Sequence, residues 1–206
     1  MAQFARENLS RRSWLLAGLT IPLFSARAAA DLLNVSFDGD NLRVAAPQFH
    51  FLTGRPLKRL QDGASVVYMS QLTLSHEDNG PGFRHQPERL TVSYDVWEEK
   101  FKVVMAGIGR SASGLSLPAA EAWCLDNLAI SALGLQPTRP FWLRLDLRVA
   151  TERELATLVG DPSGISIRTW IEFFSRKPGA DQPHWTRSAG PLRLTDLPRT
   201  ARGTRG

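Results

Sequence analysis

The chain has 206 residues, a formal net charge of +5 and a single cysteine, Cys124, which excludes an intramolecular disulfide and leaves the hydrophobic core to hold the fold. Residues 1–30 contain four arginines and one glutamate, so the rest of the chain has 21 basic and 19 acidic residues. With three of those arginines in residues 199–206, the body is nearly neutral, and its net charge gives no support for nucleic-acid binding, which requires basic residues gathered on one face.

The N-terminus has the pattern of an export signal. Arg11 and Arg12 precede an apolar run over residues 14–24, and small residues follow up to Ala30. This pattern predicts a cleavable signal peptide over residues 1–30, with cleavage after Ala30 or, as the alternative, after Ala28. The apolar run is too short to cross a bilayer as a helix, so no permanent membrane span is predicted.

The paired arginines indicate a particular export route. The stretch Ser10-Arg11-Arg12-Ser13-Trp14-Leu15 resembles the twin-arginine consensus, in which two arginines are followed by an aromatic residue and a leucine. The resemblance implies a bacterial periplasmic protein that the export machinery carries in a folded state. Ordinary secretion is the alternative.

The first half of the body reads as strands interrupted by one helix. Residues 31–37 and 41–51 are predicted strands, separated by an Asp-Gly-Asp-Asn turn. Residues 53–63 predict a short helix that ends at a glycine. Residues 64–76 predict a longer strand, and residues 89–105 predict a β-hairpin because apolar side chains alternate on both sides of a polar turn.

The second half mixes helices and strands. Residues 116–133 predict a helix with Pro118 in its first turn. Residues 141–149 place apolar side chains at every second position, with Trp142, Arg144, Asp146 and Arg148 on the other face, as a half-buried strand requires. Residues 151–161 predict a helix that begins with a capping box, and residues 165–174 are predicted to form another alternating strand, with Ile165, Ile167, Ile171 and Phe173 inward.

These elements predict a mainly β fold, an antiparallel sandwich or a strongly curved sheet with two or three short helices; an α+β fold is the alternative. One domain over residues 31–198 is expected. The basic tail, residues 199–206, is expected to be disordered because it has nothing to bury.

The order of elements resembles a family of bacterial exported proteins known as a domain of unknown function. The resemblance covers Leu33 to Val159, and it rests on the hairpin Leu90–Val103, the helix beginning at Leu117 and the strand beginning at Pro140. It implies the fold and the export. It brings no catalytic or binding residue with it.

Each stretch that resembles an enzyme motif has a simpler structural interpretation. Gly107–Ala112 fits a dinucleotide-binding pattern, but a hairpin strand precedes it and no helix opens after it, so a glycine-rich connection is expected. Asp95, Glu98 and Glu99 are expected to be solvent-exposed turn residues, and Cys124 is expected to be a buried apolar side chain. The sequence therefore favours a non-enzymatic domain without a cofactor.

Two surfaces remain as candidate binding sites. If the predicted strands 141–149 and 165–174 are neighbours, one sheet face carries four residues typical of protein interfaces: Trp142, Arg144, Arg168 and Trp170. The competing interpretation is that helices cover this face and the tryptophans form a second core layer. His76, Asp78 and His85 flank one loop and are weak metal candidates. We therefore expect a domain that binds an envelope protein or component, with a metal or small ligand as the alternative.

Overall fold

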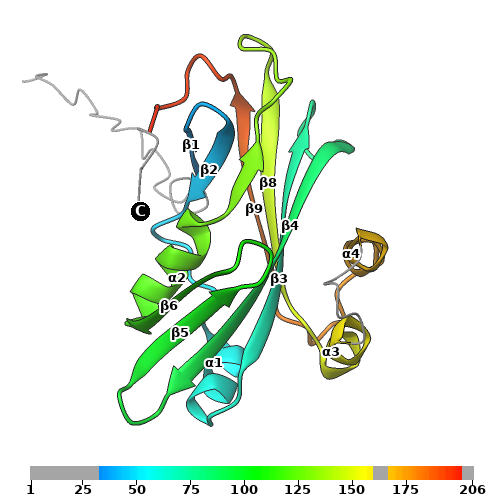
Figure 1. Cartoon of the computed structure of the whole chain (residues 1–206). Coiled ribbons are helices and arrows are strands. Elements are labelled where there is room, and N and C mark those ends of the chain that lie inside the picture. The colour runs from blue at the N-terminus through cyan, green and yellow to red at the C-terminus, as the bar shows by residue number, and fades with distance from the viewer. Residues whose placement is uncertain (1–32, 160–166, 201–206) are drawn as a thin grey trace, which may run out of the picture.

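Two antiparallel sheets of unequal size build the fold (Figure 1). The computed structural model describes residues 33–159 and 167–200, without the side chains of residues 157–159 and 167–169. The small sheet has the order β1-β2-β7, with β1 at Asn34–Phe37, β2 at Asn41–Ala45 and β7 at Ala129–Ser131. The large sheet has the order β6-β5-β4-β3-β8-β9 and contains β3 (Val66–Ser75), β4 (Gly82–Asp95), β5 (Lys100–Met105), β6 (Arg110–Leu115), β8 (Phe141–Val149) and β9 (His184–Leu192).

Four helices cover both faces of the large sheet. The helices are α1 (Gly54–Gln61), α2 (Leu117–Asp126), α3 (Glu152–Val159) and α4 (Ile167–Ser175). Figure 1 shows α1, α2 and the small sheet on one side of the large sheet, and α3 and α4 on the other. The predicted mainly β fold with a few short helices is therefore confirmed.

The main core fills the space between the two sheets. Alternation along β8 buries Phe141, Leu143, Leu145 and Leu147 on this inner face, all at 1% exposure or less. Leu42 and Ile130 face them from the small sheet, while α1 and α2 contribute Leu60, Cys124 and Leu125. Apolar burial of this kind is the main source of stability in a domain without disulfides.

A second, smaller core lies on the outer face of the large sheet. It consists of Met69, Ala150, Trp170 and Phe173, with Phe174 partly buried beside them. The predicted strand 165–174 is wrong, since residues 167–175 form helix α4. Trp170, Phe173 and Phe174 follow helical spacing and turn toward the sheet, and Ile171, predicted to be buried, is 60% exposed.

Other predicted elements match with shifted ends. The predicted helix over residues 116–133 ends at Asp126 and gives way to strand β7, which pairs with β2. Strands β6 and β9 were not predicted. The place beside β8 that was expected for residues 165–174 belongs to β9.

The ends of the chain fall partly outside the described residues. The predicted signal peptide, with Arg11, Arg12, Ala28 and Ala30, lies there, as does most of the predicted tail. The first residues of that tail are ordered: Arg199 forms a parallel bridge with Phe37, and the N–H of Thr200 donates to the Phe37 carbonyl at 3.1 Å. Within residues 33–159 and 167–200, no helix is long and apolar enough to cross a membrane.

Candidate functional site

The candidate site lies on the outer face of the hairpin formed by β3 and β4. Three cross-strand pairs place their side chains there: Met69 opposite Arg89, Gln71 opposite Pro87 and Thr73 opposite His85. These positions alternate with Tyr68, Leu72 and Leu90, which enter the main core. Residues directly opposite in an antiparallel pair share a face, so the six side chains form three successive rows.

Helix α4 covers the first of these rows. Its Trp170 and Phe174 rings stack at a centroid distance of 5.7 Å and an interplanar angle of 4°. Met69 is fully buried beneath the helix. The stacked rings therefore form a flat apolar wall that faces the second row.

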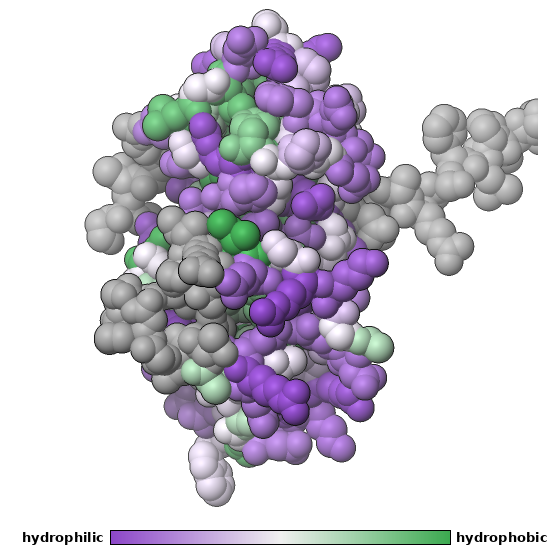
Figure 2. Space-filling model, turned by 90° about the vertical axis from the view of Figure 1, so that its right-hand side faces the viewer, coloured by the Kyte–Doolittle hydropathy of each residue, from purple (hydrophilic) through white to green (hydrophobic). Residues whose placement is uncertain are grey.

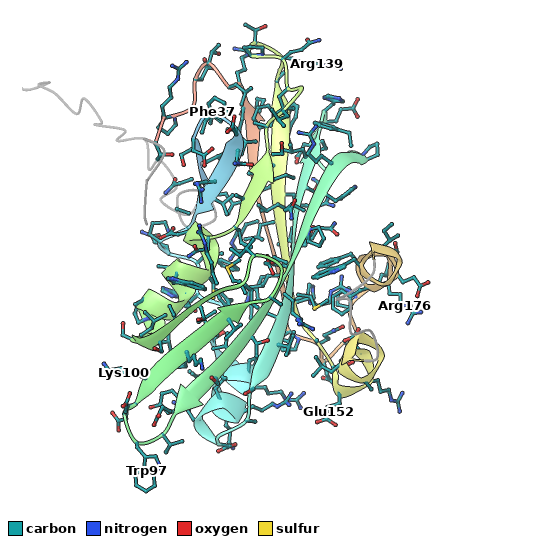
Figure 3. All side chains as sticks on the ribbon, in the orientation of Figure 1. Phe37, Trp97, Lys100, Arg139, Glu152 and Arg176 are labelled. Atoms are coloured by element: carbon teal, nitrogen blue, oxygen red, sulfur yellow. The ribbon has the colours of Figure 1, made fainter. Side chains whose placement is uncertain are left out.

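Arg148 on β8 fastens this helix to the sheet. Its Nη1 donates to the carbonyls of Phe173 at 3.0 Å and Arg176 at 2.9 Å, at the C-terminal end of α4. The guanidinium also lies 5.1 Å from the Phe173 ring centroid. Burial lowers the pKa of Arg148, although Glu154 and Asp146 act in the opposite direction. Figure 3 shows Arg176 beside α4 on this outer side.

A groove of about 530 Å³ opens between α4 and the hairpin. Its lining comes from three elements: Gln71 from β3; Phe83, Arg84, His85 and Pro87 from β4; and Trp170, Ile171, Phe174 and Ser175 from α4 and its end. Figure 2 looks onto this face and shows apolar residues gathered in its middle and near its top, between hydrophilic ones. Its size and mixed lining are those of a small-molecule site.

The polar side of the groove is a small hydrogen-bonded cluster. His85 Nδ1 lies 3.3 Å from both Gln71 Nε2 and Thr73 Oγ1, and Gln71 Nε2 lies 3.2 Å from Thr73 Oγ1. A Cβ at Gly82 would lie 2.4 Å from Thr73 Cγ2 and 2.5 Å from His85 Cε1, so only glycine fits beside this cluster. Arg84 sends its guanidinium to the Ser131 carbonyl on β7, away from the groove.

The four predicted partner-face residues do not form one exposed patch. Trp142 is half-buried because its indole lies over Gly190 on β9, where an added Cβ would come within 2.3 Å of Cδ1. Arg144 pairs with Asp146 at 2.9 Å on the same strand. Trp170 is 7% exposed in the second core, and the Arg168 side chain lies outside the described part. For Trp170, the competing interpretation of a second core layer is therefore correct.

The predicted metal candidates line different hollows. His76 stacks on Phe83 at 4.3 Å and lines a separate hollow of about 230 Å³ with Arg139, while His85 belongs to the outer groove. In residues 33–159 and 167–200, no group of three or more His, Cys, Asp or Glu side chains could hold a metal ion. Within the described residues, Asp78 is therefore not part of a group of three metal ligands.

The other candidates have structural roles. Gly107 lies in the connection between β5 and β6, and its N–H donates to Glu88 Oε1 at 2.8 Å. Asp95 Oδ1 accepts from the N–H groups of Trp97 and Glu98 and fixes the hairpin turn. Cys124 is fully buried, and burial together with Glu121 raises its pKa to about 12. The expectation that Cys124 is a buried side chain is confirmed.

Sequence reasoning missed the groove and two buried carboxylates, Glu88 and Glu121. Glu121 is 3% exposed, and its oxygens accept from the N–H groups of Phe51 and Leu52 and contact His50 Nδ1, each at 2.7 Å. This arrangement anchors the 46–53 loop to α2. The helical spacing of Trp170, Phe173 and Phe174 was the one signal in the sequence that pointed to the groove wall.

Two further features are weaker candidates. A wide cleft of about 820 Å³ beside α1 and α3 is lined by charges of both signs, and its Glu154 is engaged by Thr151 and Gln182. Trp97, 97% exposed at the tip of the β4–β5 hairpin, points away from the body (Figure 3). Neither combines a cavity with an apolar wall and converging polar groups.

Comparison of the chain with protein-family models, with curated proteins and with solved structures finds no match. The groove is therefore characterised by its own geometry.

Proposed function

We propose that the protein is an exported binding domain that holds a small, largely apolar ligand in the groove between α4 and the β3–β4 hairpin. The observation that carries this proposal is the pairing of a stacked Trp170–Phe174 wall with the hydrogen-bonded Gln71–Thr73–His85 cluster across one cavity. Apolar walls supply affinity, and a few placed polar groups supply orientation. This geometry favours the small-ligand alternative over a flat protein-binding face.

The exposed rim supports the same function. Phe83 is 40% exposed and Ile171 is 60% exposed, and both line the groove from opposite sides. Large apolar side chains exposed to water beside a cavity are typical of binding surfaces, because covering them with a ligand is favourable in free energy. A ligand lying between them would remove both from water.

A neutral fluorescent probe, N-phenyl-1-naphthylamine, tests the site. We expect the mature protein to bind it with enhanced emission, and we expect Ser175→Trp to abolish binding because the new indole fills the groove. Val104→Trp is the matched control, since Val104 is a partly exposed residue on the outer face of β5 and does not line the groove. Absence of probe binding, or equal loss in both variants, would contradict the proposal.

Export is tested separately. A periplasmic fraction should contain a chain beginning at Asp31, or at Ala29 for the alternative cleavage, and native mass spectrometry would also reveal a retained ligand. Arg11→Lys combined with Arg12→Lys should leave the precursor in the cytoplasm if the twin-arginine route is used. Unchanged export of this double variant would instead indicate ordinary secretion.

A further inference from the structure

We infer that the ligand of the groove is an amphipathic carboxylate, whose apolar body lies against Trp170 and Phe174 and whose head group binds Arg89. This inference rests on the proposed function, because it names the chemistry of the ligand for the same site. Three observations carry it: the environment of Arg89, the absence of acidic side chains among the described residues of the groove lining, and the Trp170–Phe174 wall.

Arg89 does not belong to the groove lining but lies on the same sheet face, in the adjoining row of the β3–β4 hairpin. It follows the groove residue Pro87 by two positions on β4, which corresponds to about 7 Å along a strand. A guanidinium on a side chain of this length spans that distance. Arg89 can therefore reach a head group at the end of a ligand that lies over Gln71 and Pro87.

The Arg89 side chain is partly buried, and one donor of its guanidinium, Nε, is unsatisfied. Its Nε is buried without a hydrogen-bond partner, and in the described part of the chain the side chain has no ion pair. The other two arginines of this face differ: Arg144 is paired with Asp146, and Arg148 donates to two carbonyls. A buried donor without a partner is costly, and a ligand oxygen would remove that cost.

The charge of the site selects for an anion. Among the residues that the structure describes, no Asp or Glu lines the groove. Glu88, next to Arg89 in sequence, lies on the opposite face, where it is 5% exposed and accepts the N–H of Gly107. One guanidinium fork matches one carboxylate in two parallel hydrogen bonds, which favours a carboxylate on a chain or ring.

Decanoate and decanol form the test pair because they share the apolar chain and differ in the head group. Each is titrated as a competitor of N-phenyl-1-naphthylamine on the mature protein, below its aggregation concentration and at constant ionic strength. We expect the dissociation constant of decanoate to be at least about tenfold lower than that of decanol, because decanoate gains a charge-assisted hydrogen bond to Arg89. Arg89→Met should remove this preference and keep decanol binding. Arg144→Met, on the same face but already paired in the wild type, should keep the preference.

The outcomes separate the two proposals. Equal binding of decanoate and decanol by the wild type would contradict the proposal of a carboxylate ligand, and so would an undiminished preference for decanoate in Arg89→Met. Either result would leave the proposed apolar ligand site unaffected. Probe binding that neither competitor displaces would also contradict the carboxylate ligand. If the probe itself does not bind, both the proposed ligand site in the groove and the proposed carboxylate ligand are contradicted. Far-ultraviolet circular dichroism and the thermal midpoint of each variant serve as the control that it is folded.

Discussion

Replacing Arg148 with methionine should release helix α4 while leaving the rest of the fold intact. Methionine keeps an unbranched apolar stem against Phe173 but loses both hydrogen bonds to the end of the helix. Among the described side chains, helix α4 packs through the small second core, which has four buried residues, and not through the main core. The loss should therefore be local.

The size of the effect follows from the contacts. Hydrogen bonds from a charged donor contribute about 1.5–3 kcal/mol each, and the contact of the guanidinium with the Phe173 and Phe174 rings adds about 0.5–1 kcal/mol. Removing the buried cation also relieves its desolvation cost, which the lowered pKa of Arg148 reflects. We expect a net loss of about 2–3 kcal/mol in the free energy of opening α4.

Hydrogen exchange followed by mass spectrometry measures this opening. A loss of that size accelerates exchange of the α4 amides by about 30- to 150-fold, while peptides from β3 and β8 should keep their protection. Arg144→Met is the control, because Arg144 lies on the same strand and face and contacts Asp146 rather than α4. Unchanged exchange in α4, or equal acceleration throughout the large sheet, would refute the role given to Arg148.

Three further predictions concern packing and ionisation. Gly190→Ala should cost about 1–3 kcal/mol in urea unfolding because its Cβ would overlap Trp142, and adding Trp142→Ala should recover part of that loss; additive costs would contradict this contact. The Cys124 thiol, with its pKa raised to about 12, should react with a maleimide only after unfolding, so labelling of the native protein would contradict its burial. Burial raises the pKa of Asp126 above 3.8, so the folded state binds the proton of this carboxyl more tightly than the unfolded state does. Protonated Asp126 therefore favours folding in acid, and this stabilisation is lost as the pH rises through the raised pKa. Asp126→Asn should therefore raise the thermal midpoint at neutral pH relative to wild type, an advantage that should shrink in acid; an advantage independent of pH would have another cause.

Strict periodicity made some elements predictable from the sequence. Residues 141–149 have an apolar residue at every second position and form β8 with those bounds. The short helices α1 and α3 follow from local signals. Gly63, with φ of 84°, ends the first, and the Thr151–Glu154 capping box starts the second.

The elements that were missed depend on their neighbours. Residues 165–174 contain apolar side chains at strand spacing and aromatic side chains at helical spacing, so the sequence supports both interpretations. The helix prevails where Met69 and Ala150 offer an apolar surface to its aromatic stripe. Strand β9 has little alternation, with Ala189 as its one buried residue, and it is a strand because β8 offers an edge to pair with.

The candidate site depends still more on pairing between distant residues. Arg89, Arg144 and Arg148 are all arginines at polar positions of β-strands, and only Arg144 and Arg148 have an acidic residue, Asp146, two positions away on their own strand. The fold gives each a different environment: Asp146 pairs with Arg144, the end of α4 occupies Arg148, and Arg89 keeps a buried Nε without a partner. A partly buried cation that has no ion pair in the described part of the chain is costly to the fold alone, and the proposed binding of an anion would offset this cost.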